Sequence, residues 1–220
     1  MQKTLLVVLL CLPLSTACND DGGPGADGAG GGDDGAGTVG SCADWGRYLD
    51  AHPLGYKAVH ERETIILNGD EEVSAGVTVM TTEIIESSSR RVVSRFTSDD
   101  GFNLSTEDSE TTPDEIAEAC RRFGSIPPMT GVSEGFDNNT TIAGIETITV
   151  RAGTFETDRI EVDFTLDGSG ITGMGTTWIY RGGPTSNLVV SEDLTQTGGG
   201  LGPGMGTRLL MELIEFDPGR

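Results

Sequence analysis

Apolar and polar residues alternate along most of the chain after residue 60, which is the pattern of half-buried β-strands. The stretch RIEVDFTLD, at 159–167, is the clearest case. Ile160, Val162 and Phe164 fall on one face of an extended chain, and acidic or hydroxyl residues fall on the other. A strand with one apolar face and one wet face is typical of an antiparallel sheet.

Other segments have the same character and are separated by turns rich in Gly, Asn, Asp and Pro. They are 60–67, 75–87, 90–98, 101–107, 140–150, 175–182, 187–196 and 207–216. Short links between consecutive strands favour hairpins and a meander. The sequence therefore predicts about nine strands in one antiparallel sheet.

Two short amphipathic helices are predicted beside these strands. In the stretch at 113–124, Thr112 is the predicted N-cap and Glu115 completes a capping box. A second helix is predicted over 41–52. Because a large sheet with one apolar face needs a cover, we expect a mainly β fold, with a single curved, half-barrel-like antiparallel sheet and both helices packed on its concave face.

The first 17 residues have the features of a secretory signal. Lys3 supplies a positive charge, and the apolar run that follows at 4–14 is too short to span a membrane. Small residues come next, directly before Cys18. This arrangement resembles the bacterial lipobox, with Ser15 where the lipobox usually has Leu. The resemblance implies that Cys18 carries diacylglycerol and becomes the mature N-terminus; the alternative is an ordinary signal peptide with an unmodified Cys18.

The segment that follows Cys18 consists largely of Gly and Asp and has almost nothing to bury, so we expect a disordered spacer. The predicted organisation is a signal peptide at 1–17, the lipidated cysteine and tether at 18–41, and a single β-rich domain at 42–220. A lipid anchor, a spacer and a folded domain together indicate a cell-envelope lipoprotein. We expect it on the outer membrane.

The chain is strongly acidic, with a formal net charge of −21. The signal holds one positive charge and the tether five negative charges, which leaves −17 on residues 42–220. Such a surface repels phosphate backbones and anionic lipid headgroups, so nucleic acid is excluded as a partner. Attachment to the membrane must then come from the lipid on Cys18.

Cysteine usage predicts a disulfide in the domain. Cys11 leaves with the signal and Cys18 takes the lipid, so Cys42 and Cys120 remain in a compartment that permits disulfides. Both lie on the apolar sides of the predicted helices, and we expect them to be bonded to each other. The alternative is two buried free thiols.

The stretch ETITVRAGTFETDRIEV, at 146–162, resembles the V-x-V-P-A-G-T-F hairpin of periplasmic proteins of unknown function that are related in architecture to the lipoprotein-localisation factors. Val150, Ala152 and the run Gly153–Phe155 match this motif, while Arg151 stands in place of its Pro. The resemblance implies a half-barrel with an apolar interior, which in some relatives holds acyl chains. It implies no catalytic residues.

Motifs that would carry catalysis are incomplete. The stretch GVSEG contains Ser133 in the G-x-S-x-G pattern of serine hydrolases, but His52 and His60 both precede it and prolines replace the required strand. Neither histidine has a partner at zinc-ligand spacing. We therefore predict a protein that is not an enzyme and that uses no metal or other cofactor.

Two functions remain open. In the first, the concave face binds an apolar ligand or lipid chain, with Phe164, Trp178 and Met211 as the predicted ligand-binding residues. In the second, the domain has a filled core and serves as a structural or interaction lipoprotein with an envelope protein as its partner. A pocket of a few hundred Å³ beside these residues would favour the first function, and complete packing would favour the second.

Overall fold

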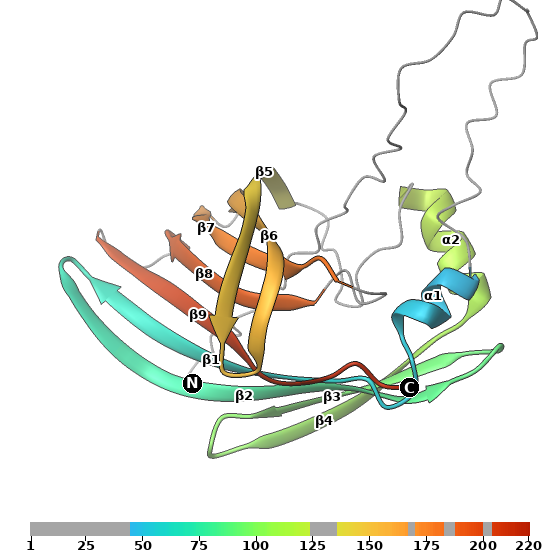
Figure 1. The fold of residues 1–220 in the computed structure, drawn as a ribbon. Helices are drawn as coiled ribbons and strands as arrows, with labels where there is room; N and C mark the ends of the chain where they lie inside the picture. The colour runs from blue at the N-terminus through green and yellow to red at the C-terminus, as the bar shows by residue number, and fades with distance from the viewer. Residues whose placement is uncertain (1–44, 124–135, 167–169, 183–187, 200–203) are drawn as a thin grey trace, which may run out of the picture.

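The structure is a computed structural model that describes residues 45–123, 136–166, 170–182, 188–199 and 204–220. It contains one sheet with two short helices (Figure 1). The helices are α1 (Trp45–Ala51) and α2 (Pro113–Phe123). The strands are β1 (Lys57–Asn68), β2 (Glu71–Ser87), β3 (Val92–Asp99), β4 (Leu104–Thr111), β5 (Phe136–Val150), β6 (Gly153–Leu166), β7 (Ile171–Tyr180), β8 (Val189–Thr197) and β9 (Met205–Asp217).

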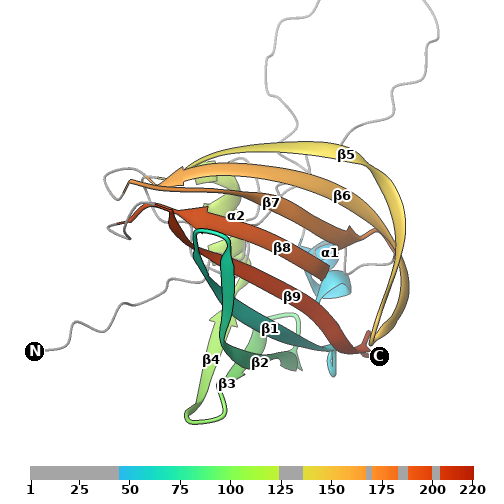
Figure 2. The same ribbon diagram turned by 90° about the vertical axis from the view of Figure 1, so that its left-hand side faces the viewer.

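The nine strands form one antiparallel sheet in the order β4-β3-β2-β1-β9-β8-β7-β6-β5. Two meanders, β1 to β4 and β5 to β9, are joined where β9 pairs with β1. The sheet is curved but does not close into a barrel, because β4 and β5 end it on opposite sides (Figure 2). The predicted mainly β fold, with one curved antiparallel sheet and two short helices, is confirmed.

One face of the sheet, called the inner face below, is buried along the central strands. The strand register places Ile160, Thr177, Glu192 and Met211 side by side on this face across four neighbouring strands. Buried apolar side chains fill the rest of it, none more than 5% exposed: Met80, Ile84, Ile160, Val162, Phe164, Ile179, Val190, Leu194, Leu209, Met211 and Leu213. The sheet thus buries its alternate positions, as the sequence pattern predicts.

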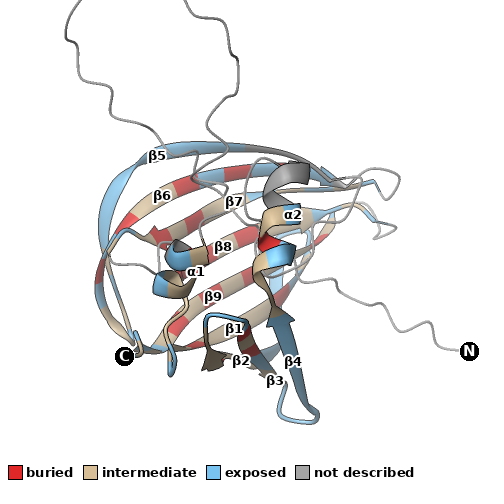
Figure 3. Cartoon of the chain, turned by 90° about the vertical axis from the view of Figure 1, so that its right-hand side faces the viewer, coloured by how far each residue is buried: buried red, intermediate tan, exposed pale blue. Residues whose placement is uncertain are grey.

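Both helices lie on the inner side of the sheet (Figure 3). Tyr48 of α1 and Ile116 of α2 form a buried cluster with Ile84 of β2 and Val92 of β3. Helix α2 begins with the predicted capping box: the Thr112 amide donates to Oε2 of Glu115 at 2.8 Å, and the Glu115 amide donates to Oγ1 of Thr112 at 3.4 Å.

The β5–β6 hairpin bends past the end of β7 and reaches β9 (Figure 2). At its turn, Gly153 has a φ of 140°, a conformation that glycine adopts readily. The Ala152 amide donates to the Leu213 carbonyl oxygen at 3.2 Å. Arg151 forms ion pairs with Glu61 at 2.6 Å and Glu212 at 3.3 Å. These contacts hold the hairpin against the middle of the sheet without adding a strand pairing.

The buried side of β6 changes along its length. Ile160 and Phe164 are buried in its second half, whereas Phe155 and Thr157, which have the opposite parity, are buried in its first half. The first half belongs to the bent hairpin, where the Phe155 ring lies 5.4 Å from the Tyr180 ring and 6.1 Å from the Phe216 ring. The bend therefore brings the other side of the strand into the core.

Candidate functional site

Phe164 and Met211, two of the three predicted ligand-binding residues, lie on the inner face. They are 4% and 5% exposed, and β7 and β8 separate their strands. The Phe164 ring occupies the space over Gly173, where a β carbon would overlap it, and Leu194 fills the space over Gly175 in the same way. The glycines of β7 therefore allow large side chains from β6 and β8 to pack the inner face closely.

Trp178, the third predicted ligand-binding residue, does not share this face. Its neighbour Thr177 is on the inner face, so alternation along β7 turns Trp178 to the outer face. There its Nε1 donates to Oε2 of Glu146 at 2.8 Å. The structure therefore brings Phe164 and Met211 to one face of the sheet and places Trp178 on the other; binding of a ligand by these residues stays a prediction.

A carboxyl group lies within the inner face. Glu192 of β8 is 6% exposed and has Thr177 and Met211 as its register neighbours. Oγ1 of Thr177 donates to Oε2 of Glu192 at 3.3 Å. Burial raises the pKa of Glu192 to about 7, while the Thr177 hydrogen bond and the positive charge of Arg62 act to lower it.

Each of the two histidines forms a hydrogen bond with a backbone carbonyl oxygen. His60 Nε2 lies 2.8 Å from the Val189 carbonyl oxygen, and His52 Nδ1 lies 2.7 Å from the Tyr48 carbonyl oxygen, so a ring N–H donates in each case. Burial lowers the pKa of both histidines. Within the described ranges, no three His, Cys, Asp or Glu side chains gather closely enough to hold a metal ion.

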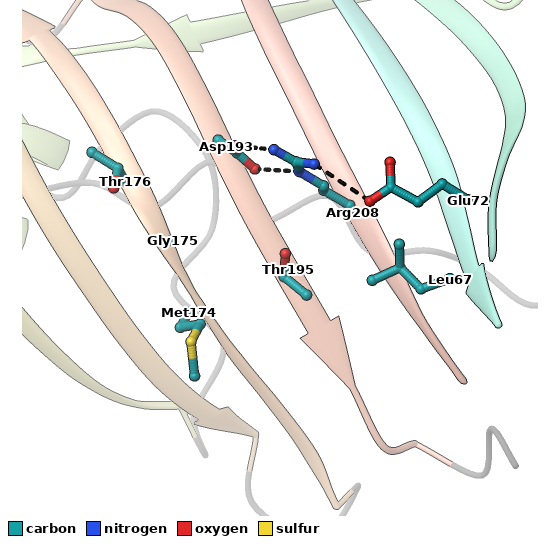
Figure 4. A pocket seen from close by; sticks show the side chains of 8 residues that line it. All are labelled: Leu67, Glu72, Met174, Gly175, Thr176, Asp193, Thr195 and Arg208. Carbon is teal, nitrogen blue, oxygen red and sulfur yellow. Dashed lines mark hydrogen bonds and ion pairs between the residues drawn. The ribbon is translucent and has the colours of Figure 1, made fainter. Parts of the chain in front are cut away.

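The outer face carries a shallow hollow of about 290 Å³ over β7, β8 and β9 (Figure 4). Arg208 donates to both carboxylate oxygens of Asp193, at 2.8 and 2.6 Å, and lies 3.6 Å from Glu72. Because these partners already engage the guanidinium, the ion-pair network holds the strands together more readily than it binds a ligand. A second hollow, of about 310 Å³, lies beside Leu54 and the C-terminal Arg220. Neither hollow opens on Phe164 or Met211.

Several predicted sites lie outside the described residues. These are the lipid-bearing Cys18, the tether, Cys42 and Ser133. Cys120 belongs to α2, but its side chain is not described. The lipid anchor and the Cys42–Cys120 bond therefore stay predictions. Among the described helices, none is long and apolar enough to cross a membrane.

Comparison with solved structures finds similarity to several bacterial proteins. One, from Bacteroides fragilis, is described as exported and as having a YmcC-like fold; it is 12% identical, with a TM-score of 0.39, over 76% of this chain and 97% of its own. One from Parabacteroides distasonis, described as a lipoprotein, has 12% identity and a TM-score of 0.38 over the same shares.

A LolA superfamily protein from Nitrosomonas europaea is 6% identical, with a TM-score of 0.18, over 76% of this chain and 89% of its own. No protein-family model matches the sequence, and no curated protein matches it significantly. These TM-scores are too low for the similarity to carry a functional conclusion.

Proposed function

We propose that this protein is a lipoprotein of the cell envelope, anchored through Cys18, whose domain has a filled core and acts by docking a protein partner. The observation that carries the proposal is the packing of the inner face, where Phe164 lies over Gly173 and is 4% exposed. Burial of this degree favours a packed inner face over an open acyl-chain pocket at Phe164.

Apolar surface is found instead on the outside of the domain. Large apolar side chains are exposed on the β1–β2 hairpin, on the β3–β4 hairpin and along β5. Phe102, at the tip of the β3–β4 hairpin, is 94% exposed. These exposed side chains are the candidates for contact with another macromolecule.

Binding of an apolar ligand is the second candidate. Among the described residues, the buried cluster of Ile160, Val162, Phe164 and Ile179 contains only side chains of strands and none of α1 or α2. An apolar sheet surface to which the described helices add no side chain of the cluster favours an apolar ligand on that surface.

Native mass spectrometry of the exported full-length chain with Cys18→Ser separates the two candidates, because this variant carries no anchor lipid. We expect the bare mass of the chain, less two hydrogens if Cys42 and Cys120 are bonded. An additional mass in the lipid range that denaturation removes would contradict the filled core and establish the second candidate.

A further inference from the structure

The two edges of the sheet differ in how they meet solvent. On the β4 edge, Arg95 forms an ion pair with Asp108 at 2.8 Å, and Arg91 pairs with Glu110 at 3.1 Å. Charged side chains along an edge strand oppose pairing with a further strand. The β4 edge is therefore protected.

The β5 edge has no such charges over 138–145. Among the described strands β5 pairs with β6 alone, so alternate backbone N–H and C=O groups along it face away from the sheet. The side chains of Thr140 through Thr147 are all exposed, and Ile142 and Ile145 are each 60% exposed. Glu146 is the one charged residue of the segment 140–147, and an exposed edge with so little charge is a ready template for an additional strand.

A β-bulge places the two isoleucines on the same side. Ile142 lies opposite Ile160, and Ile145 lies opposite Asp158, with a register shift between Ile142 and Gly144. Since residues 158 and 160 share a face of β6, both isoleucines extend the inner face beyond the buried Ile160. Apolar surface thus continues to the last strand.

The other end of the same face is polar. The register carries the face of Ile84 across Ser94 to Ser109 of β4, and β4 also places Ser105 and Glu107 on this side. The inner face therefore ends in polar groups at β4 but in exposed isoleucines at β5. One further strand at β5 would cover these isoleucines and pair the open backbone groups.

We propose that the β5 edge, residues 140–147, binds an extended segment of another envelope protein as a tenth strand of the sheet, and that this segment is apolar or β-branched at its centre and carries Lys or Arg at its flanks. The inference deepens the proposed function and rests on it. Strand addition of this type draws its affinity from backbone hydrogen bonds and its specificity from alternate side chains.

The charges around the β5 edge indicate which kind of partner would bind there. Exposed carboxylates outnumber cations near the edge, with Glu146, Glu161 and Asp163 against Arg159, which pairs with Glu161 at 3.0 Å, and the chain carries −21 overall. A second copy of this chain would bring the same negative charge to the contact, whereas basic flanks would complement it. The occupant is therefore a basic partner and not a second copy.

Site-specific photo-crosslinking of the full lipid-anchored chain, in the bacterium that produces it, tests the proposal. The crosslinker is placed at Ile145 on β5 and, as a matched control, at Thr106 on β4. We expect adducts at Ile145 alone, mapped by mass spectrometry to one extended segment with Lys or Arg at its flanks. Equal adducts at both positions, adducts to a second copy, or no adduct at Ile145 would overturn it.

The mapped segment, made as a synthetic peptide, gives the quantitative test. Ile145→Lys should weaken its binding at least tenfold, Ile145→Glu should weaken it less because the flanks are basic, and Thr106→Lys should leave it unchanged. Thermal unfolding of each variant checks that the fold is retained. If the same partner is captured but binds the β5 variants unchanged, the β5 assignment fails while the proposed docking function stands; if no partner is captured from any exposed position, the docking function itself fails.

Discussion

Phe164 of β6 lies against Gly173, its register partner in β7, and any β carbon at position 173 would overlap the phenyl ring. The two residues form a large-to-small pair in the buried inner face. Glycine within a strand gives no side-chain packing of its own, so its value here is the space that it leaves. The pair is one of the contacts on which the proposed filled core depends.

Substitutions at this pair should be coupled. Phe164→Ala should lower the free energy of unfolding by about 3–5 kcal/mol, and Gly173→Ala should lower it by about 1–3 kcal/mol through overpacking. In the double variant the second substitution should cost less, because the ring that it overlaps has gone. A β carbon at position 173 would also approach the Thr195 carbonyl oxygen, so part of the cost of Gly173→Ala should remain in the double variant.

Denaturant unfolding measures these costs, and Met174→Ala is the matched control because Met174 is the exposed neighbour of Gly173. The control should change the free energy of unfolding by no more than about 0.5 kcal/mol. Strictly additive costs at positions 164 and 173 would contradict the contact between them.

The placement of Trp178 on the outer face predicts unequal costs at two residues that the sequence groups together. Met211→Ala should destabilise the domain by about 2–5 kcal/mol, because Met211 is buried on the inner face. Trp178→Phe should cost about 1 kcal/mol or less, since it removes chiefly one hydrogen bond to an exposed Glu146. Thermal or denaturant unfolding of both variants checks the assignment, and a larger loss for Trp178→Phe would reverse it.

The alternation of apolar and polar residues predicted the strands. The amphipathic and capping patterns predicted both helices and the capping box at Thr112. The alternation could not show which residues of different strands lie on the same face of the sheet, because this depends on the register in which the strands pair. In β7 the inner positions include Gly173, Gly175 and Thr177 as well as Ile179, while Met174 and Trp178 point outward, so large apolar residues occur on both faces of this strand. For this reason the sequence alone did not show on which face Trp178 lies.

The change of buried side along β6 was also hidden from the sequence. The alternation from Ile160 to Phe164 shows clearly which of these side chains point to the inner face. The burial of Phe155 instead depends on the bend that brings the hairpin to β9. Glu192 did leave a signal: it occupies the position between Val190 and Leu194 in a period of two, where an apolar residue is expected.

The Arg151 contacts should stabilise the tip of the β5–β6 hairpin more than they stabilise the whole domain. Its ion pairs with Glu61 and Glu212 involve exposed side chains, and pairs of this kind contribute about 1 kcal/mol or less. Arg151→Met should therefore leave global unfolding nearly unchanged but speed hydrogen exchange at the Ala152 amide, which bonds to Leu213. Arg159→Met, on the same hairpin, is the control, and equal exchange at Ala152 in both variants would show that Arg151 does not hold the hairpin tip.

Glu192 should make the stability of the domain depend on pH. Burial raises its pKa from 4.5 to about 7 in the folded protein, so folding favours the protonated carboxyl. The contribution of Glu192 is therefore fully present below pH 4.5 and is lost as the pH rises through 7.

Glu192→Gln keeps a neutral side chain at every pH. It should match the parent near pH 4 and exceed it by about 3 kcal/mol above pH 8, where the parent must bury a carboxylate close to Arg62 and Thr177. Urea unfolding of both proteins across this pH range measures the difference, with Asp163→Asn on the exposed face of β6 as the control. A difference that stays constant with pH would show that the Glu192 carboxyl does not titrate in this range.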